Sequence, residues 1–294
     1  MVSITVEALT SQLINGLVLG MLYVMLAVGL SLIFGMIGVI NFAHGVIFTL
    51  GAYLAFTVRD VLGFWPAVLV AGLIAGCIGA VIELGLLRRL YSRDPLNGFL
   101  MTFGLALLME ELIRAIWGAA GVPFALPDAL GGLVLWGPIV QTKYRLVVLL
   151  VAASMVFLLW LALEKTRLGM VIRAGSRDPL MVQMLGTNIK RVFTLIFGVG
   201  SALAAVAGVL AAPLWGLQPG LGTSAIMPSF VVVAIGGLGS IRGAVIAGLL
   251  VGEVISLSIT FYPPMSEVAM YILMTLVLLL RPRGLFGEEW ERFE

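Results

Sequence analysis

Long runs of apolar residues, separated by short polar or glycine-rich connections, form the dominant pattern along the chain. A helix that crosses a bilayer needs about 20 predominantly apolar residues. Two runs are less regular, because Val46–Val58 is short and Phe230–Leu238 leads into a glycine-rich stretch. The clearer runs are Leu13–Phe34, Pro66–Leu87, Leu100–Trp117, Leu146–Leu163, Val192–Ala212, Val245–Ile259 and Val268–Leu280. This pattern predicts an all-α polytopic transmembrane bundle of about eight or nine membrane segments, forming one domain over residues 1–294.

The composition excludes a soluble fold. Hydrophobic residues make up 61% of the 294 residues and charged residues only 11%, against about 25% charged residues in ordinary soluble domains. A net charge of +2 is too small to indicate nucleic-acid binding. Cys77 is the only cysteine and lies in an apolar run, which excludes a disulfide framework and argues against a thiolate metal site.

The distribution of Lys and Arg predicts which connections face the cytoplasm, because cytoplasmic loops carry an excess of both. Three segments are rich in these residues: the connection 164–191, the segment 88–93, and a C-terminal tail with Arg281, Arg283 and Arg292. The connections 118–142, 213–227 and 260–267 contain neither, so we expect them on the outer side. This distribution places the C-terminus in the cytoplasm and leaves the side of the N-terminus open.

The first apolar run has no cationic residue before it, since Arg59 is the first Lys or Arg of the sequence. A cleavable signal peptide has a cationic start and a short apolar core. We therefore expect this run to be a retained membrane segment.

Two glycine-bracketed polar breaks interrupt the apolar runs, one in each half of the chain, at 35–45 and 234–243. Irregular backbone at membrane depth is tolerated only where protein or a watery cavity receives its polar groups, and paired breaks point to a transport pathway. A hydrated turn at the first break and a cytoplasmic hairpin at the second, where Arg242 favours water, stay open as simpler interpretations. The pair is also compatible with an inverted internal repeat. The residues that we expect to line a path are Asn41, Phe42, His44, Gly45, Gly236, Gly237, Gly239 and Ser240.

Few ionisable residues lie inside the apolar runs. Glu253 lies deep in one run, and Glu110, Glu111 and Arg114 share another. Intramembrane ionisable residues are functional candidates, although i,i+3 and i,i+4 pairing also gives the last three a structural interpretation. His44 is the only histidine, so we expect no metal site, and a lone histidine more often has a structural role.

The connection 164–191 is long, basic and still carries apolar residues, which is typical of a docking element. Asp178 followed by Pro179 predicts the start of a short helix, and Gly186 predicts its end. Met181, Met184 and Leu185 would then present an apolar face to a groove in a partner. An ordinary solvated loop is the alternative.

No energy-converting or catalytic motif occurs in the sequence. The chain lacks G-x-x-x-x-G-K-[ST], G-x-S-x-G and H-E-x-x-H, and its only lysines are Lys143, Lys165 and Lys190. If nucleotide drives this protein, the ATPase is another polypeptide.

Four segments, in the same order along the chain, match one family pattern. They are 15–23 with 38–45; 168–174 with Asp178 and 185–188; 235–244; and the ending 281–287. Together they resemble the signatures of the LivH-type permeases of branched-chain amino acid ABC transporters. The one departure is Thr187, where that family commonly has isoleucine.

The resemblance implies a permease subunit of a bacterial inner-membrane importer for leucine, isoleucine or valine, with no catalytic activity and no cofactor of its own. It implies a homologous second permease, two cytoplasmic P-loop ATPases that bind ATP and Mg²⁺, and a periplasmic substrate-binding protein. It also implies that the connection 164–191 is the ATPase-coupling loop, with Gly169, Arg173, Ala174, Asp178, Leu185 and Gly186 as its marked residues.

Three alternatives stay open. Relatives with these signatures are associated with urea and short amides, so the substrate is less certain than the fold. An ion-coupled transporter that works alone would use Glu253, Glu110 and Glu111 as coupling carboxylates. An intramembrane enzyme based on His44 is disfavoured, because the sequence offers no clear nucleophile or metal set.

Overall fold

A computed structural model describes residues 6–91, 93–137 and 139–287, which leaves Arg292 of the predicted basic tail outside the described part. The α-helices of that part are α1 (Val6–Ile37), α2 (Ala43–Leu62), α3 (Phe64–Gly85), α4 (Pro95–Trp117), α5 (Lys143–Lys165), α6 (Arg167–Arg177), α7 (Pro179–Met184), α8 (Ile189–Trp215), α9 (Leu221–Gly236), α10 (Ile241–Phe261) and α11 (Ser266–Leu280). Short 3₁₀ turns lie at Leu87–Arg89, Asp128–Leu130 and Pro263–Met265.

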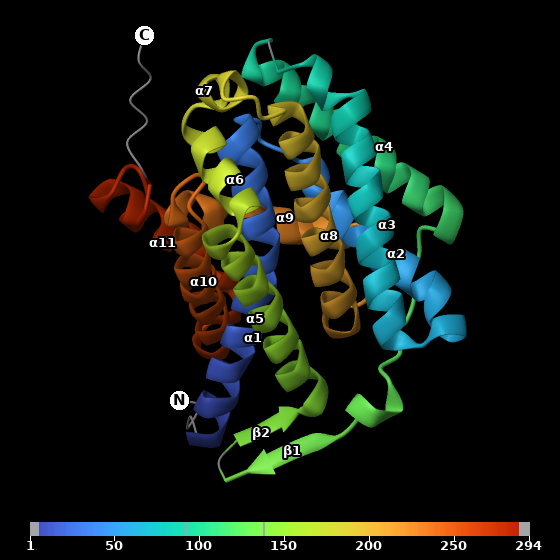
Figure 1. The fold of residues 1–294 in the computed structure, drawn as a ribbon. Helices are drawn as coiled ribbons and strands as arrows, with labels where there is room; N and C mark the ends of the chain where they lie inside the picture. Colours follow the sequence, from blue (N-terminus) through green and yellow to red (C-terminus); the bar gives the residue numbers. More distant parts are fainter. Residues whose placement is uncertain (1–5, 92, 138, 288–294) are drawn as a thin grey trace.

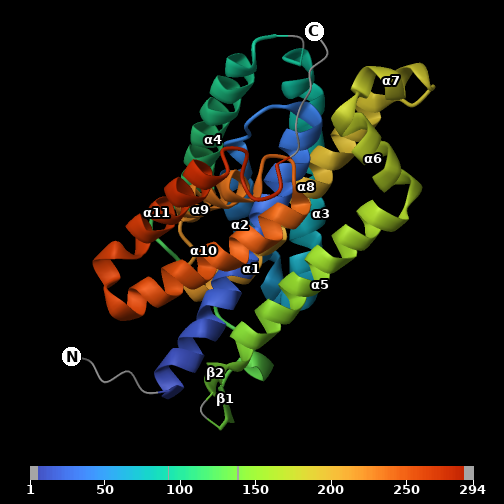
Figure 2. The same cartoon turned by 90° about the vertical axis from the view of Figure 1, so that its left-hand side faces the viewer.

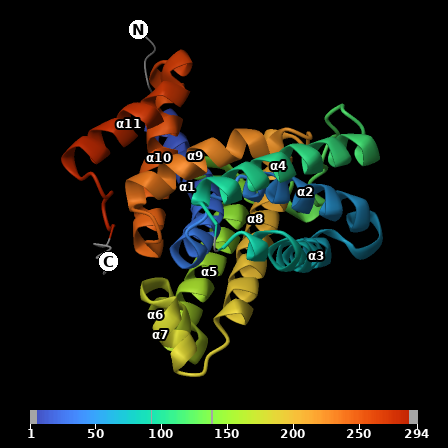
Figure 3. The same ribbon diagram turned by 90° about the horizontal axis from the view of Figure 1, so that it is seen from above.

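The helices form one bundle around α1, which is buried over most of its length (Figure 1). On one side α1 packs against α10, and on the other against α8, which in turn packs against α2 and α3. Figure 2 shows α5 leading up to α6 and α7, and the view from above in Figure 3 shows α11 and α3 at opposite sides of the bundle. The prediction of an all-α polytopic membrane bundle is confirmed.

Close helix packing rests on glycines that face one another across α1 and α10. A Cβ built on Gly20 would lie 2.8 Å from the carbonyl oxygen of Gly248. A Cβ on Gly252 would overlap the backbone of Gly16 and Gly20 in the same way. Small residues four apart let two helix backbones approach closely in lipid, where there is no hydrophobic drive between helices. The pairs Gly16/Gly20 and Gly248/Gly252 therefore form one interface between these two helices.

The membrane segments differ in detail from those predicted. Within the described residues, seven helices are long and apolar enough to cross a bilayer: α1, α2, α3 with its 3₁₀ extension, α5, α8, α10 and α11 with its preceding turn. The run 46–58 lies in a full 20-residue helix, because Arg59 and Asp60 continue α2. By contrast α9 has only 16 residues, and α4 falls outside the seven, because it carries Glu110, Glu111 and Arg114.

A β-hairpin of β1 (Leu133–Trp136) and β2 (Ile139–Thr142) adds to the predicted helices. It lies at the same end of the bundle as the N-terminal end of α1, where the Ser11 hydroxyl donates to the carbonyl of Val140 at 3.1 Å. The helices α6 and α7 lie at the opposite end (Figure 1). The basic connections thus gather at one end, and the predicted outer connection that contains the hairpin lies at the other.

Candidate functional site

The two predicted breaks meet in the fold. A Cβ built on Gly35 of α1 would lie 3.2 Å from the Cα atom of Gly239, which belongs to the turn between α9 and α10. Beside this contact lies a cavity of about 280 Å³, near the lower end of the range for small-molecule sites. Its lining comes from α1, the first break, α9, the second break and α11: Leu30, Phe34, Val39, Ile40, Asn41, Met227, Phe230, Val231, Val233, Ala234, Leu238, Tyr271 and Met274.

The first break joins α1 to α2 through a left-handed glycine, Gly38, whose φ is 73°. Its backbone is partly satisfied from α4, because the Thr102 hydroxyl donates to the carbonyl of Ile40 at 3.1 Å and lies 3.3 Å from the backbone nitrogen of Phe42. Asn41 is 1% exposed, and its side-chain amide makes no hydrogen bond among the described residues. An unpaired buried amide is costly, so a polar partner at Asn41, such as water or substrate, would lower the free energy of this region.

The other residues predicted near the first break lie against neighbouring helices. His44 is fully buried in the first turn of α2, beside Gly29 of α1, and neither ring nitrogen has a hydrogen-bond partner in the described part of the chain. Gly45 packs against the backbone of Gly222 in α9. The Phe42 ring meets three other rings, those of Phe99, Phe103 and Phe230.

The second break is a tight turn held by the segment after α11. Gly237 and Gly239 both have left-handed φ values, 98° and 82°. The backbone nitrogens of Leu285 and Phe286 donate to the carbonyls of Ile235 and Gly236 at 2.7 and 3.0 Å, so the chain after α11 satisfies the free end of α9.

The start of α10 is fixed just as closely. The Ser240 hydroxyl accepts from the backbone nitrogen of Gly243 at 3.1 Å and caps the helix. A Cβ on Gly243 would overlap the carbonyl of Gly236, so the two helix ends cross in direct backbone contact. Because Arg242 is exposed, this break has the form of the hairpin that the sequence left open as an alternative.

Of the eight predicted path residues, Asn41 lines the cavity, whereas the other seven do not belong to its lining. Contact of any of them with substrate stays a prediction. Leu238 completes the lining from the second break, and Leu30, Phe34, Tyr271 and Met274 complete it from α1 and α11. No sequence signal separates these apolar residues from the many others in the chain, because their role depends on which helices meet.

The predicted coupling loop forms two helices, and the second begins as predicted, with Asp178 as its N-cap and Pro179 at its first position. Thr166 caps α6 through the backbone nitrogen of Gly169 at 3.1 Å, and Asp178 caps α7 through that of Met181 at 2.8 Å. A Cβ on Gly169 would overlap the Leu163 carbonyl, which explains the glycine. Gly186 follows α7 with a φ of 88°, as expected for a residue that ends a helix.

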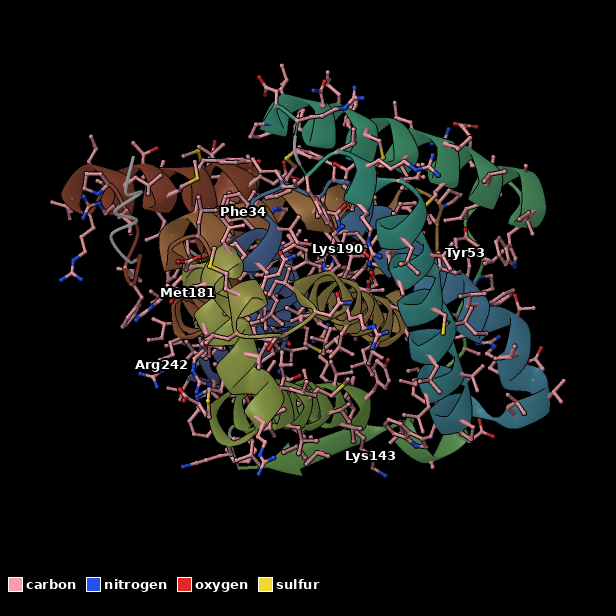
Figure 4. All side chains as sticks on the ribbon, turned by 45° about the horizontal axis from the view of Figure 1, so that its top comes forward. Phe34, Tyr53, Lys143, Met181, Lys190 and Arg242 are labelled. Carbon is pink, nitrogen blue, oxygen red and sulfur yellow. The ribbon has the colours of Figure 1, made fainter. Side chains whose placement is uncertain are left out.

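An apolar surface on α7 and the following turn is exposed. Leu180, Met181, Met184 and Leu185 are exposed by 68, 54, 81 and 78%. Figure 4 shows Met181 on α7, the helix that carries this surface. Ordinary water-facing turns do not place four large apolar side chains together, so this surface fits a partner groove.

The helix α6 contacts the first break directly and is linked to the second through Glu164 of α5. Gly175 lies against Met36, near the end of α1, and a Cβ on it would lie 3.0 Å from the Met36 methyl. Arg173 donates to the carbonyl of Leu163 and lies 3.7 Å from a carboxylate oxygen of Glu164. The same carboxylate pairs with Arg242 of the second break at 2.8 Å. A shift of α6 would therefore act on the two breaks together.

A buried polar network fixes α8 to α3 at the same end of the bundle. Glu83 is fully buried and accepts two hydrogen bonds from Arg88, at 2.9 and 3.1 Å. It also accepts from the hydroxyls of Thr194 at 2.6 Å and Tyr91 at 2.7 Å. Burial and the bond to Glu83 raise the pKa of Tyr91, which keeps the phenol protonated as a donor. The network gives α8, the helix after the coupling loop, a rigid neighbour.

No group of three or more His, Cys, Asp or Glu side chains in the described part of the chain is arranged to hold a metal ion. The ion pairs of Glu83, Glu110 and Glu164 each join two helices or two turns of one helix.

Comparison with known proteins gives one consistent result. A family profile described as "Branched-chain amino acid transport system / permease component" matches residues 12–278. The high-affinity branched-chain amino acid transport system permease protein BraD of Pseudomonas aeruginosa is 32% identical over 94% of this chain and 95% of its own length. LivH of Escherichia coli K12 is 32% identical over 94% of each chain.

More distant proteins match as well. LivM of E. coli K12, also a permease protein of that system, is 26% identical over 91% of this chain and 68% of its own length. Among solved structures, PsaBC from Streptococcus pneumoniae in complex with Fab has a TM-score of 0.46 at 14% identity, over 97% of this chain and 93% of that one. A score this low supports no statement about the fold.

Proposed function

The chain belongs to the family of branched-chain amino acid transport permease components, and on that premise we propose that it forms half of the channel of an ATP-driven importer. It is a multi-pass membrane protein. The observation that carries the proposal is that α6 contacts the first break through Met36 and is linked to the second through Glu164, because this connects a cytoplasmic docking surface to the wall of the cavity.

The transported class is a small zwitterion with an apolar side chain, such as leucine, isoleucine or valine. The cavity wall is almost wholly aliphatic and aromatic, which suits a branched side chain. Asn41 and the backbone groups of the first break supply donors and acceptors without fixed charge.

The ATPase partners bind ATP and Mg²⁺ and dock on the surface formed by Leu180, Met181, Met184 and Leu185. Closure of the ATPases moves α6, and the Glu164 ion pairs and the Met36 contact pass that movement to the two breaks. This chain hydrolyses no ATP. The C-terminus lies in the cytoplasm, and a periplasmic binding protein delivers substrate to the opposite end of the bundle.

Co-purification is the first test. The tagged protein is extracted gently from its native membrane, and the proteins that accompany it are identified. Recovery of a second permease with two P-loop ATPases is the expected result. Recovery of this chain alone, in a detergent that preserves related complexes, would favour a self-contained transporter and make Glu253 the next residue to replace.

The substrate is tested separately with the recovered complex in proteoliposomes. We expect ATP-dependent uptake of radiolabelled leucine that excess isoleucine and valine inhibit and excess urea does not. Inhibition by urea or acetamide alone would move the assignment to the short-amide branch.

A further inference from the structure

The helix α4 carries a charged triad of Glu110, Glu111 and Arg114. Charged side chains are unfavourable on a helix that faces lipid. Arg114 pairs with Glu110 at 2.6 Å and with Glu111 at 2.9 Å. Glu110 also accepts from the hydroxyl of Thr223, in the first turn of α9, at 3.0 Å. The exposed fractions are 43% for Arg114, 67% for Glu111 and 17% for Glu110, so two of the three groups face out of the bundle.

This triad lies inward of the outer end of α2. The indole nitrogen of Trp117, the last residue of α4, donates to Thr57 at 3.0 Å. Thr57 lies about 8 Å before the end of α2 at Leu62, at about 1.5 Å per residue. Arg114 and the two glutamates precede Trp117 in α4, so they lie farther still from the outer end of α2. Figure 1 shows the same arrangement, since α4 ends higher in the bundle than α2, α8 and α10.

The backbone next to the triad is irregular at the same depth. The chain leaves α4 through Gly118 and leaves α8 through Gly216, both with left-handed φ values. These two connections meet where the backbone nitrogen of Val122 donates to the carbonyl of Leu217 at 2.8 Å. Exposed ionised side chains and non-helical backbone at membrane depth both require water or protein in place of lipid.

We propose that Glu110, Glu111, Arg114 and Thr223 form an outer transit site for a zwitterionic amino acid. This site lies in a water-filled vestibule on the outer side of the cavity. The guanidinium of Arg114 donates to the substrate carboxylate in place of that of Glu111, and the released Glu111 carboxylate pairs with the substrate ammonium. The inference rests on the proposed function for the identity of the substrate.

The geometry assigns different tasks to the two glutamates. Glu110 contacts Arg114 of its own helix and Thr223 of α9 and stays fixed, whereas Glu111 has one ion pair and is the more exposed. An exposed ion pair contributes little stability. The free energy therefore changes little when the substrate carboxylate replaces the Glu111 carboxylate beside Arg114. The site therefore binds substrate weakly, which suits a transit site because it must also release the substrate.

Water access is tested by cysteine labelling of the complete importer in proteoliposomes. In a Cys77→Ser background, Ala115→Cys places a thiol one turn from Glu111 without changing the triad. A membrane-impermeant cationic thiosulfonate added outside should label it rapidly, and saturating leucine should slow labelling at least threefold. Leu73→Cys, 70% exposed on α3, is the lipid-facing control and should stay unlabelled. Absence of labelling at position 115, as expected if the second permease or lipid covers the triad, or labelling that leucine does not slow, would overturn the proposal.

Transport kinetics supply the second readout. Glu111→Gln and Arg114→Gln should raise the KM for leucine about five- to tenfold with a smaller change in kcat, and Arg114→Lys should recover part of the loss. Asp60→Asn changes another exposed outer carboxylate and should leave both constants unchanged. If the wild-type complex takes up no leucine, the proposed function fails, while Ala115→Cys still reports on the vestibule. If the wild-type complex transports but both Gln variants keep its KM, this inference fails alone.

Discussion

The two helix breaks look alike in the sequence but differ in what surrounds them. The first is a short link with one left-handed glycine, and it leaves the Asn41 amide buried without a partner among the described residues. The second has two left-handed glycines, a capped helix start at Ser240 and backbone hydrogen bonds to the chain after α11. Its one charged residue, Arg242, is exposed and paired.

The difference separates two tasks. Unsatisfied polar groups in a low-dielectric region are costly, and they persist at sites that bind a ligand or water. A fully satisfied turn that an ion pair ties to Glu164, next to α6, is instead suited to transmit a movement. The first break is thus suited to bind a ligand, and the second is suited to transmit a movement between helices.

The largest effect is expected at the crossing of α9 and α10. Gly243→Ala adds a Cβ that overlaps the Gly236 carbonyl, and we expect a loss of about 3 kcal/mol in stability. Thermal unfolding in detergent, followed by size-exclusion chromatography, measures it. Gly104→Ala is the matched control, because open space surrounds Gly104, and an Ala in a helix is favoured by about 0.5–1 kcal/mol. Equal melting temperatures for both variants would show that the second break is loosely packed.

Asn41→Leu should have opposite effects on stability and on transport. Removal of an unpaired buried amide should raise stability by about 1–2 kcal/mol, whereas leucine uptake should fall at least fivefold. The melting temperature and initial uptake rate of one preparation check both. Asn97→Leu, an exposed amide at the start of α4, should change uptake little. A destabilised Asn41→Leu protein with normal uptake would mean that the amide has a structural partner and no transport role.

Ser240→Ala removes the cap of α10 and should cost about 1 kcal/mol. Ser154→Ala is the control, since that hydroxyl donates only to the Leu150 carbonyl within its own helix. Denaturation midpoints of the two variants give the comparison. A loss no larger than that of the control would show that the start of α10 is fixed by the glycine contact alone.

Glu164→Gln should have the smallest effect on stability, because both of its ion pairs are partly exposed and such pairs contribute less than about 1 kcal/mol. The ratio of leucine transported to ATP hydrolysed should nevertheless fall several-fold, since the link from α6 to the second break is lost. Both rates are measured in the same proteoliposomes, with Asp128→Asn in the outer connection as control. An unchanged ratio would contradict transmission through this ion pair.

Local sequence signals predicted the helices and their ends well. Asp178 with Pro179 starts α7, Gly186 follows its end, and the long apolar runs are helical. These features depend on side chains within a few residues of one another, which explains the agreement. The hairpin β1–β2 was not predicted, because its strands lie in a short connection between two strong helical patterns.

The predictions for the site were weaker. Asn41 lines the cavity, but the glycines of both breaks pack against other glycines, so a polar break in the sequence indicated close backbone contact as much as a binding surface. The lining residues on α9 and α11 and the depth of the α4 triad depend on how helices from distant parts of the chain are packed.

The sequence by itself determined that lipid is the solvent, that helices cross it, that two of them are interrupted, and that a basic amphipathic arm lies at one end. Those properties follow from the hydropathy, the glycine positions and the charges of the sequence. Each of these patterns is recognised within about one helix length. Only the tertiary structure decided that Gly35 meets Gly239, about two hundred residues away, and that α6 contacts the first break and is linked through Glu164 to the second. The physical reason is that shape complementarity between helix faces, which hydropathy does not encode, selects the contacts among equally apolar helices.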